Sequence, residues 1–331
     1  MKKHNEKDSR IENLRFSLSE SATATVIGAV LLLGIIFSVL TIIWVGCVPE
    51  WKTDAESSHM DNVWKDMADV KSKIDMMSII LASTPDSSKI NTSNPSSSSP
   101  QLVMSVPFHM GGGSLPIIGT TKSSGILAVN KDKCIMSAIV TYNDSTSFPF
   151  NISCGTITYA SQNHYYVDQG FSYESGALIL DQGEQPVMML YPSIRFSKAS
   201  SNQYNISINA VRIFRALYDS PQIISSNSGC SLRLTGIDYR HIYDSDEYQN
   251  RSIERLVLTI YTTHPDAWEQ YLSKMLADAG IDEEDYTLVE NEDNNNVRLI
   301  FPKLDSTAPG TLKRLYISET VVKAEPGIGL N

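Results

Sequence analysis

The chain contains one long apolar stretch without a charged side chain, residues 21–49, and this stretch constrains the fold more than any other feature. As a helix it would extend about 43 Å at roughly 1.5 Å per residue, which exceeds the roughly 30 Å hydrocarbon core of a bilayer. The core helix of a soluble protein normally shows a polar stripe, and none appears between Val26 and Val48. The stretch therefore predicts a transmembrane helix close to the N-terminus.

Two other kinds of N-terminal segment share some of these features. A secretory signal peptide has an apolar region of only about 7–15 residues that ends in small residues. This stretch is longer and ends between Trp44 and Trp51, which is typical of an interfacial aromatic anchor. A lipoprotein signal ends in a cysteine, and Val45-Gly46-Cys47 resembles such a site. Lipidation at Cys47 would make the chain anchored rather than spanning, so it stays open as an alternative.

The charges on either side of the apolar stretch predict its orientation. Basic residues precede it at Lys2, Lys3, Lys7, Arg10 and Arg15. Only Lys52 follows closely behind it. Because positively charged flanks stay in the cytoplasm, we expect residues 1–20 to be a cytoplasmic leader and the bulk of the chain to lie outside the cell.

The order of a basic leader, a glutamate at the apolar boundary, a long apolar helix and an outer body resembles the precursors of archaeal type IV pilins and archaellins. The resemblance implies that a prepilin-type peptidase cuts before Phe16, which would make Glu20 the fifth residue of the mature chain. It also implies self-association through the N-terminal helix. Arg15 stands where the family usually has glycine or another small residue, so an uncleaved, permanent anchor is the alternative.

A second resemblance covers much of residues 16–280. The segments that carry it are Asn163-His164-Tyr165-Tyr166-Val167-Asp168-Gln169, Tyr173-Glu174-Ser175-Gly176-Ala177 and Asp181-Gln182-Gly183, together with the stretch from Val48-Pro49-Glu50-Trp51 through Met60. They are similar to a group of archaeal surface proteins with a pilin-like N-terminus and a β-rich ectodomain. That group has no assigned activity, so the resemblance implies location and architecture rather than chemistry.

Beyond the membrane, residues 50–82 carry an apolar stripe at helical spacing. Its members are Met60, Val63, Met67, Val70, Ile74, Met77 and Leu81. Spacings of three and four residues predict an amphipathic helix. We expect this stalk helix to pack on the chain's own β domain, because three heptads are marginal for an independent coiled coil. A seam between subunits would use the same stripe and remains the alternative.

The composition changes abruptly after Ala82. Residues 83–101 are rich in Ser and Pro and carry almost no apolar side chains, which predicts a linker. Residues 102–331 then contain short runs of β-branched and aromatic residues separated by Asn, Gly, Pro and Ser. We therefore expect an α+β protein whose β-rich ectodomain, residues 102–331, is mostly antiparallel and sandwich-like.

One helix is expected within the ectodomain, near residues 264–280. Pro265 and Asp266 suit a first helical turn, and Gly280 suits the end. Strand-like runs before and after it predict a β-α-β-β element with residues 291–296 as the hairpin turn.

The balance of charge is acidic, with 27 basic and 37 acidic residues and a formal net charge of −10. Because the basic residues form no stripe, nucleic acid is not an expected partner. Acceptor sequences for N-glycosylation occur at Asn91, Asn143, Asn151, Asn205 and Asn250. They suit a chain that faces the cell exterior, where envelope proteins or glycans are candidate partners.

The cysteines allow one internal bridge outside the membrane. Cys134 and Cys154 are candidate neighbours across a sheet, and buried free thiols are the equally open alternative. Cysteine and histidine spacing predicts no metal site, and no cofactor motif appears. Glu174 has aromatic neighbours that would raise its pKa, but it lacks a partner for acid–base catalysis.

These features together predict a non-enzymatic protein of the cell surface. Its expected role is that of a pilin-like subunit or membrane-anchored envelope component in assembly or adhesion. A permanently anchored binding protein for envelope glycans or surface proteins is the runner-up. An anchored hydrolase is less favoured because no catalytic constellation is visible.

Overall fold

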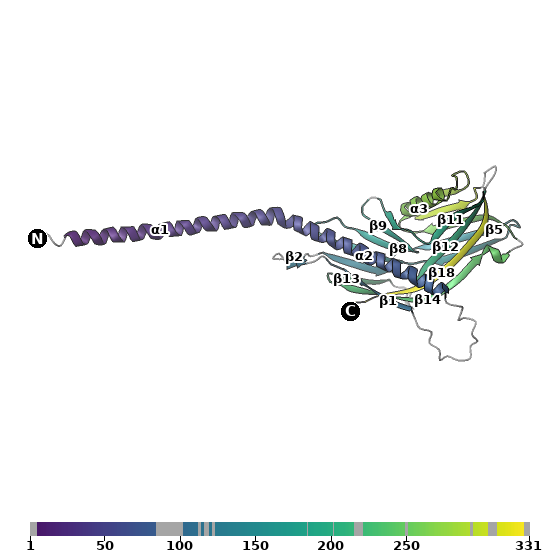
Figure 1. Ribbon diagram of the computed structural model, residues 1–331, viewed down its shortest axis with the longest axis horizontal. Coiled ribbons are helices and arrows are strands. Elements are labelled where there is room, and N and C mark those ends of the chain that lie inside the picture. The colour runs from purple at the N-terminus through teal and green to yellow at the C-terminus, as the bar shows by residue number, and fades with distance from the viewer. Residues whose placement is uncertain are drawn as a thin grey trace, which may run out of the picture.

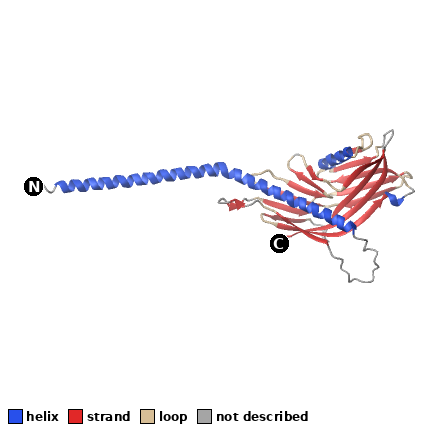
Figure 2. Ribbon diagram, viewed as in Figure 1, coloured by secondary structure: helices blue, strands red, loops and turns tan. Residues whose placement is uncertain are grey.

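The computed structural model describes residues 5–83, 102–111, 114–115, 119–120, 123–183, 185–200, 202–214, 221–248, 251–291, 294–303 and 310–327. The predicted linker lies outside these ranges except for Ser83. The described chain is an α+β protein, as the sequence predicts. A long N-terminal helical rod projects from a head made mostly of strands (Figures 1 and 2).

The rod consists of α1 (Asn5–Ile42), a short π-helical turn (Ile43–Cys47) and α2 (Val48–Ser83). Figure 1 shows α1 extending away from the head and α2 running along it. The π-helical turn precedes Pro49, whose ring leaves no N–H for a regular helical hydrogen bond. The apolar part of α1 is long enough to cross a membrane, and none of its most apolar window is buried. It is therefore not a core helix of the head.

The described strands form two large sheets and a small hairpin. The ten-stranded sheet contains β1 (Leu102–Phe108), β5 (Ile135–Tyr142), β6 (Ser147–Ser153), β11 (Ile194–Ser200), β12 (Gln203–Phe214), β14 (Cys230–Asp244), β15 (Ile253–Tyr261), β16 (Thr287–Asn291), β17 (Asn296–Phe301) and β18 (Thr311–Gly327). The six-stranded sheet contains β4 (Ser124–Val129), β7 (Thr156–Gln162), β8 (Gly170–Glu174), β9 (Ala177–Asp181), β10 (Val187–Leu190) and β13 (Gln222–Ser226). The hairpin pairs β2 (Ser114–Leu115) with β3 (Gly119–Thr120).

Strand β18 organises the larger sheet. It pairs antiparallel with β14 and parallel with β12. The parallel pair departs from an all-antiparallel sandwich, although the other pairings of the two large sheets are antiparallel. Side chains from both large sheets share two buried clusters, which gives the expected sandwich-like core.

The first cluster surrounds α3 (Pro265–Asp278). Trp268 is fully buried at the N-terminal end of this helix, and Leu272 and Leu276 follow on the same face. The neighbouring strands β15, β17 and β16 lie in that order in the sheet. This arrangement confirms the predicted β-α-β-β element.

The second cluster contains α2 together with strands of both large sheets. Six members of the stripe, from Met60 to Met77, are at most 2% exposed and pack against both large sheets. Packing of the stripe on the chain's own β domain is thereby confirmed. Residues 102–331 do not, however, form a separate core, because α2 supplies part of it. The spacing of an apolar stripe does not show which surface it packs against, whereas the tertiary structure does.

Candidate functional site

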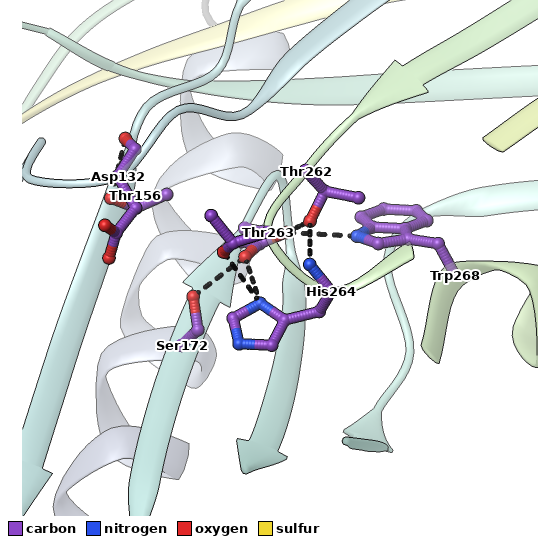
Figure 3. A network of polar contacts seen from close by, with 8 residues as sticks. Asp132, Thr156, Ser172, Thr262, Thr263, His264 and Trp268 are labelled. Atoms are coloured by element: carbon purple, nitrogen blue, oxygen red, sulfur yellow. Dashed lines mark hydrogen bonds and ion pairs between the residues drawn. The ribbon is translucent and has the colours of Figure 1, made fainter. Parts of the chain in front are cut away.

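A buried polar network joins β8 to the segment between β15 and α3, where Ser172, Thr262, His264 and Trp268 surround Glu174. Figure 3 shows these four residues pointing toward one another. Glu174 ends β8 and is 0% exposed. Its Oε1 accepts a hydrogen bond from Ser172 Oγ at 2.9 Å and lies 2.8 Å from His264 Nδ1. Its Oε2 accepts hydrogen bonds from Thr262 Oγ1 at 2.5 Å and Trp268 Nε1 at 3.1 Å. Four donors thus converge on one carboxylate.

Local sequence places these groups at two chain reversals. After Glu174 the chain turns through Ser175 and Gly176, whose φ angles are 47° and 88°. Gly176 suits the left-handed conformation because it has no Cβ. On the other side, Thr262 and His264 lie between the end of β15 and the start of α3. The network therefore fastens the β8–β9 turn to the N-terminal end of α3.

The electrostatics of this network correct one expectation. Burial opposes the ionised form of Glu174, but the hydrogen bond and positive charge of His264, with further hydrogen bonds from Thr262 and Trp268, outweigh it and lower the pKa of Glu174. Burial likewise opposes the charged form of His264, but the hydrogen bond and charge of Glu174 raise the pKa of His264. The predicted rise for Glu174 is wrong because the hydrogen bonds and positive charge of these partners outweigh the effect of its burial.

The four contacts also limit what Glu174 does chemically. An ionised carboxylate offers about four lone-pair positions, and all four donors here come from the protein itself. A general base needs a lone pair that faces its substrate. The geometry therefore favours a structural tie between the sheets over acid–base chemistry.

The two candidate bridge cysteines lie close to this network. The strands β5 and β6 pair with Ile135 opposite Ser153, so Cys134 and Cys154 are the next facing pair. Cys154 N–H donates to the Cys134 carbonyl at 2.8 Å. Both residues are free thiols and are buried. Their side chains are in hydrogen-bonding contact, and this contact together with burial raises the pKa of the Cys134 thiol. The expected neighbour relationship is confirmed.

The candidate glycosylation sites fall in different environments. Asn143 follows β5 and Asn151 lies on β6, and both are exposed. Asn205 lies on β12, where its Oδ1 is buried and, among the described residues, has no hydrogen-bond partner. Asn91 and Asn250 lie outside the described residues. Of the three sites that the structure describes, Asn143 and Asn151 are thus the more accessible.

The candidate assembly residues lie in the rod. The backbone of Arg15, Phe16 and Glu20 belongs to α1, whereas their side chains lie outside the described part of the chain. Within the described part, no group of three or more His, Cys, Asp or Glu side chains is arranged to hold a metal ion.

A set of polar contacts that sequence reasoning missed fixes α2 to the head. His59 Nε2 lies 3.1 Å from the Tyr159 hydroxyl, and Ser78 Oγ lies 2.7 Å from that of Thr320. Asp66 accepts hydrogen bonds from the backbone N–H and Nδ1 of His109, each at 2.8 Å. No local spacing signals such pairs, because their members lie 43 to 242 positions apart.

Comparisons with family models, curated proteins and solved structures found no match. The geometry and the sequence therefore carry the functional argument.

Proposed function

We propose that this protein is a single-pass membrane protein of the cell surface that works in assembly or adhesion as a pilin-like subunit. In this proposal the leader lies in the cytoplasm, α1 spans the membrane and the head lies outside. Its partners are the membrane, further copies of the chain through the N-terminal helix, and envelope proteins or glycans.

One observation carries this proposal: a continuous helical rod ends inside the core of the head. The large apolar side chains of α1 are 44% exposed at Leu40 and up to 68% exposed at Ile42, so the head does not cover them. The stripe of α2, in contrast, is buried. A rod built in this way transmits its orientation to the head, which a Gly/Ser tether would not do. That property suits a subunit held in a defined assembly.

The proposed assembly step depends on Glu20. After a cut before Phe16 by a prepilin-type peptidase, Glu20 would lie near the start of an apolar helix. An unpaired carboxylate in an apolar bundle is costly. A neighbouring copy's new N-terminal amine would neutralise it.

A second candidate function rests on Arg15. This residue occupies the position before the proposed cut, where the resembling family has a small residue. An uncleaved chain would be a permanent anchor for a head that binds envelope glycans or surface proteins.

Mass spectrometry of the native protein's N-terminus tests these candidates. A mature chain that starts at Phe16 supports the subunit, and an intact leader supports the permanent anchor. Protease protection of membrane vesicles tests the shared topology, because only the leader and the membrane-spanning part of α1 should be protected from a protease on the outer side. A head protected from that protease would contradict both.

A further inference from the structure

A loop of the head, residues 163–168, contacts the first turns of α2, which directly follow the uncharged stretch of residues 21–49. Lys52 Nζ donates a hydrogen bond to the Tyr165 hydroxyl at 3.0 Å and lies 4.6 Å from the centre of the same ring. Thr53 Oγ1 donates to the Tyr165 carbonyl at 3.4 Å. The loop therefore sits at the level of residues 52 and 53 of the helix.

Glu56 holds this loop in place. Its carboxylate is 0% exposed and accepts the backbone N–H groups of His164 at 3.1 Å, Tyr165 at 2.7 Å and Tyr166 at 2.8 Å. Charge-assisted bonds to successive N–H groups are strong. Leaving such a buried carboxylate without these donors would be costly. The loop is thus fixed to α2 rather than resting on it.

The loop turns its apolar side chains outward. Tyr165 is 46% exposed and Val167 is 45% exposed, whereas Tyr166 between them is half-buried against the second core cluster. Trp51, one position before Lys52, is 45% exposed. Exposed aromatic rings beside a lysine are typical of the layer between hydrocarbon and water.

Distance along the helix places this group close to the bilayer. The last residue of the uncharged stretch is Pro49. Lys52 and Thr53 follow by three and four positions, which is roughly 5 Å at the rise of an α-helix. The headgroup layer on each side of the hydrocarbon core is about 5–7 Å thick. Because Trp44 and Trp51 place the outer end of the stretch at the interface, Tyr165 lies at the level of the headgroup layer.

We infer that the 163–168 loop, together with Trp51, is a second membrane contact whose partner is the headgroup layer of the lipid bilayer. It rests on the proposed membrane span. A single helix leaves a head free to rotate about the helix axis and to tilt. A second contact beside the helix restricts the tilt, although not the rotation about the membrane normal, and so keeps the same end of the head facing outward.

Spin labelling of the full chain in phosphatidylcholine nanodiscs tests this inference. A nitroxide is attached to Val167→Cys in a Cys47→Ser background, where the remaining cysteines are buried. Its accessibility to oxygen, which partitions into lipid, is compared with its accessibility to a water-soluble nickel chelate. We expect the ratio of oxygen accessibility to nickel-chelate accessibility to be several-fold higher at Val167 than at a control label on Phe148→Cys.

Phe148 is a matched control because it is 37% exposed and lies beside Tyr248. It belongs to β6, which pairs with β5 at the end of the head away from α1 (Figure 1). A label on Leu32→Cys, within α1, reports the span itself. If Leu32 is immersed but Val167 matches Phe148, the loop contact is wrong and the span stands. If Leu32 is not immersed, the proposed span fails.

A second variant tests the role of Glu56. Glu56→Gln removes the charge that holds the loop and should lower the oxygen-to-nickel ratio at Val167 while leaving Leu32 unchanged. Asp54→Asn changes an exposed carboxylate on the same helix and should leave both labels unchanged. An unchanged Val167 ratio in Glu56→Gln would refute the positioning role of Glu56.

Discussion

Glu174 Oε1 and His264 Nδ1 lie 2.8 Å apart although 90 positions separate them in the chain. The contact joins β8 of the six-stranded sheet to the segment between β15 and α3. Phe171 and Tyr173 of β8 belong to the second core cluster, whereas β15 and α3 contribute to the first. Breaking a buried ion pair leaves an uncompensated charge and typically costs about 3–5 kcal/mol. Several predictions depend on long-range contacts of this kind.

The Glu174–His264 pair predicts a defined pH dependence of stability. Because the folded-state pKa of Glu174 is lowered, its contribution is present above the unfolded pKa of about 4.3 and is lost as pH falls through the folded pKa. Because the folded-state pKa of His264 is raised, its contribution is present below about 6.5 and is lost as pH rises through the folded pKa. The pair should therefore stabilise the head most between these values.

Thermal unfolding of residues 48–331 at pH 3 to 9 measures this effect. Glu174→Gln should lower the melting temperature most within that pH window and flatten both limbs of the profile. Arg251→Gln removes an ion pair with Asp144 whose side chains are 39% and 42% exposed, and it should change the melting temperature little because exposed ion pairs contribute little to stability. Parallel profiles for wild type and Glu174→Gln would contradict the prediction.

The buried stripe of α2 predicts a strong effect of Val70→Asp. Val70 is 0% exposed in the second core cluster, so an aspartate there buries a carboxylate without a partner. We expect a loss of several kcal/mol in the free energy of unfolding, measured with urea. Ser72→Asp on the exposed side of the same helix should change stability little. Equal stability of the two variants would mean that the stripe is not a core element.

The shared core also predicts that the strands alone are insufficient. Residues 102–331 without α2 should bind a hydrophobic dye and unfold without a sharp transition. Residues 48–331 should unfold cooperatively under the same conditions. A cooperative transition of the shorter fragment would contradict this prediction and would support a domain boundary at the Ser/Pro segment.

The facing thiols of Cys134 and Cys154 predict a disulfide when the protein folds in the presence of a small-molecule disulfide. Thiol–disulfide exchange would reduce that oxidant and remove one hydrogen from each cysteine. A bridge closing a loop of about 20 residues adds roughly 3 kcal/mol. Mass spectrometry of non-reduced peptides should detect the bridge in wild type and Cys230→Ser but not in Cys134→Ser. Bridges between Cys230 and either partner would contradict the geometry.

The proposed assembly step predicts that Glu20 matters only between copies. Glu20→Ala should insert into the membrane normally, because a neutral residue only lengthens the apolar stretch. It should be absent from filaments or oligomers recovered from the cell surface, and Glu12→Ala in the leader serves as the control. Equal incorporation of Glu20→Ala and wild type would contradict this mechanism.

Local patterns in the sequence predict individual elements well. The spacing from Met60 to Met77 predicts α2, and Pro265 with Gly280 brackets α3 within a few residues. Strand β12 follows from its alternation of side chains. Local sequence patterns do not predict strand β18, although it lies at the centre of the larger sheet. Its first half contributes Leu315 and Ile317 to one core cluster, and its second half contributes Val322 and Ala324 to the other, so its burial pattern lacks a simple period.

By itself, the sequence determined the apolar rod, the amphipathic helix, the α+β class and the acidic character of the chain. Each follows from composition or from a repeat within a few turns, because helical and strand geometry act over short distances. Only the tertiary structure decided that α2 belongs to the core, that Glu56 binds the backbone near Tyr165, and that Glu174 meets His264. These contacts join residues about 90 to 110 positions apart. They depend on how whole sheets and helices pack, which no local repeat encodes.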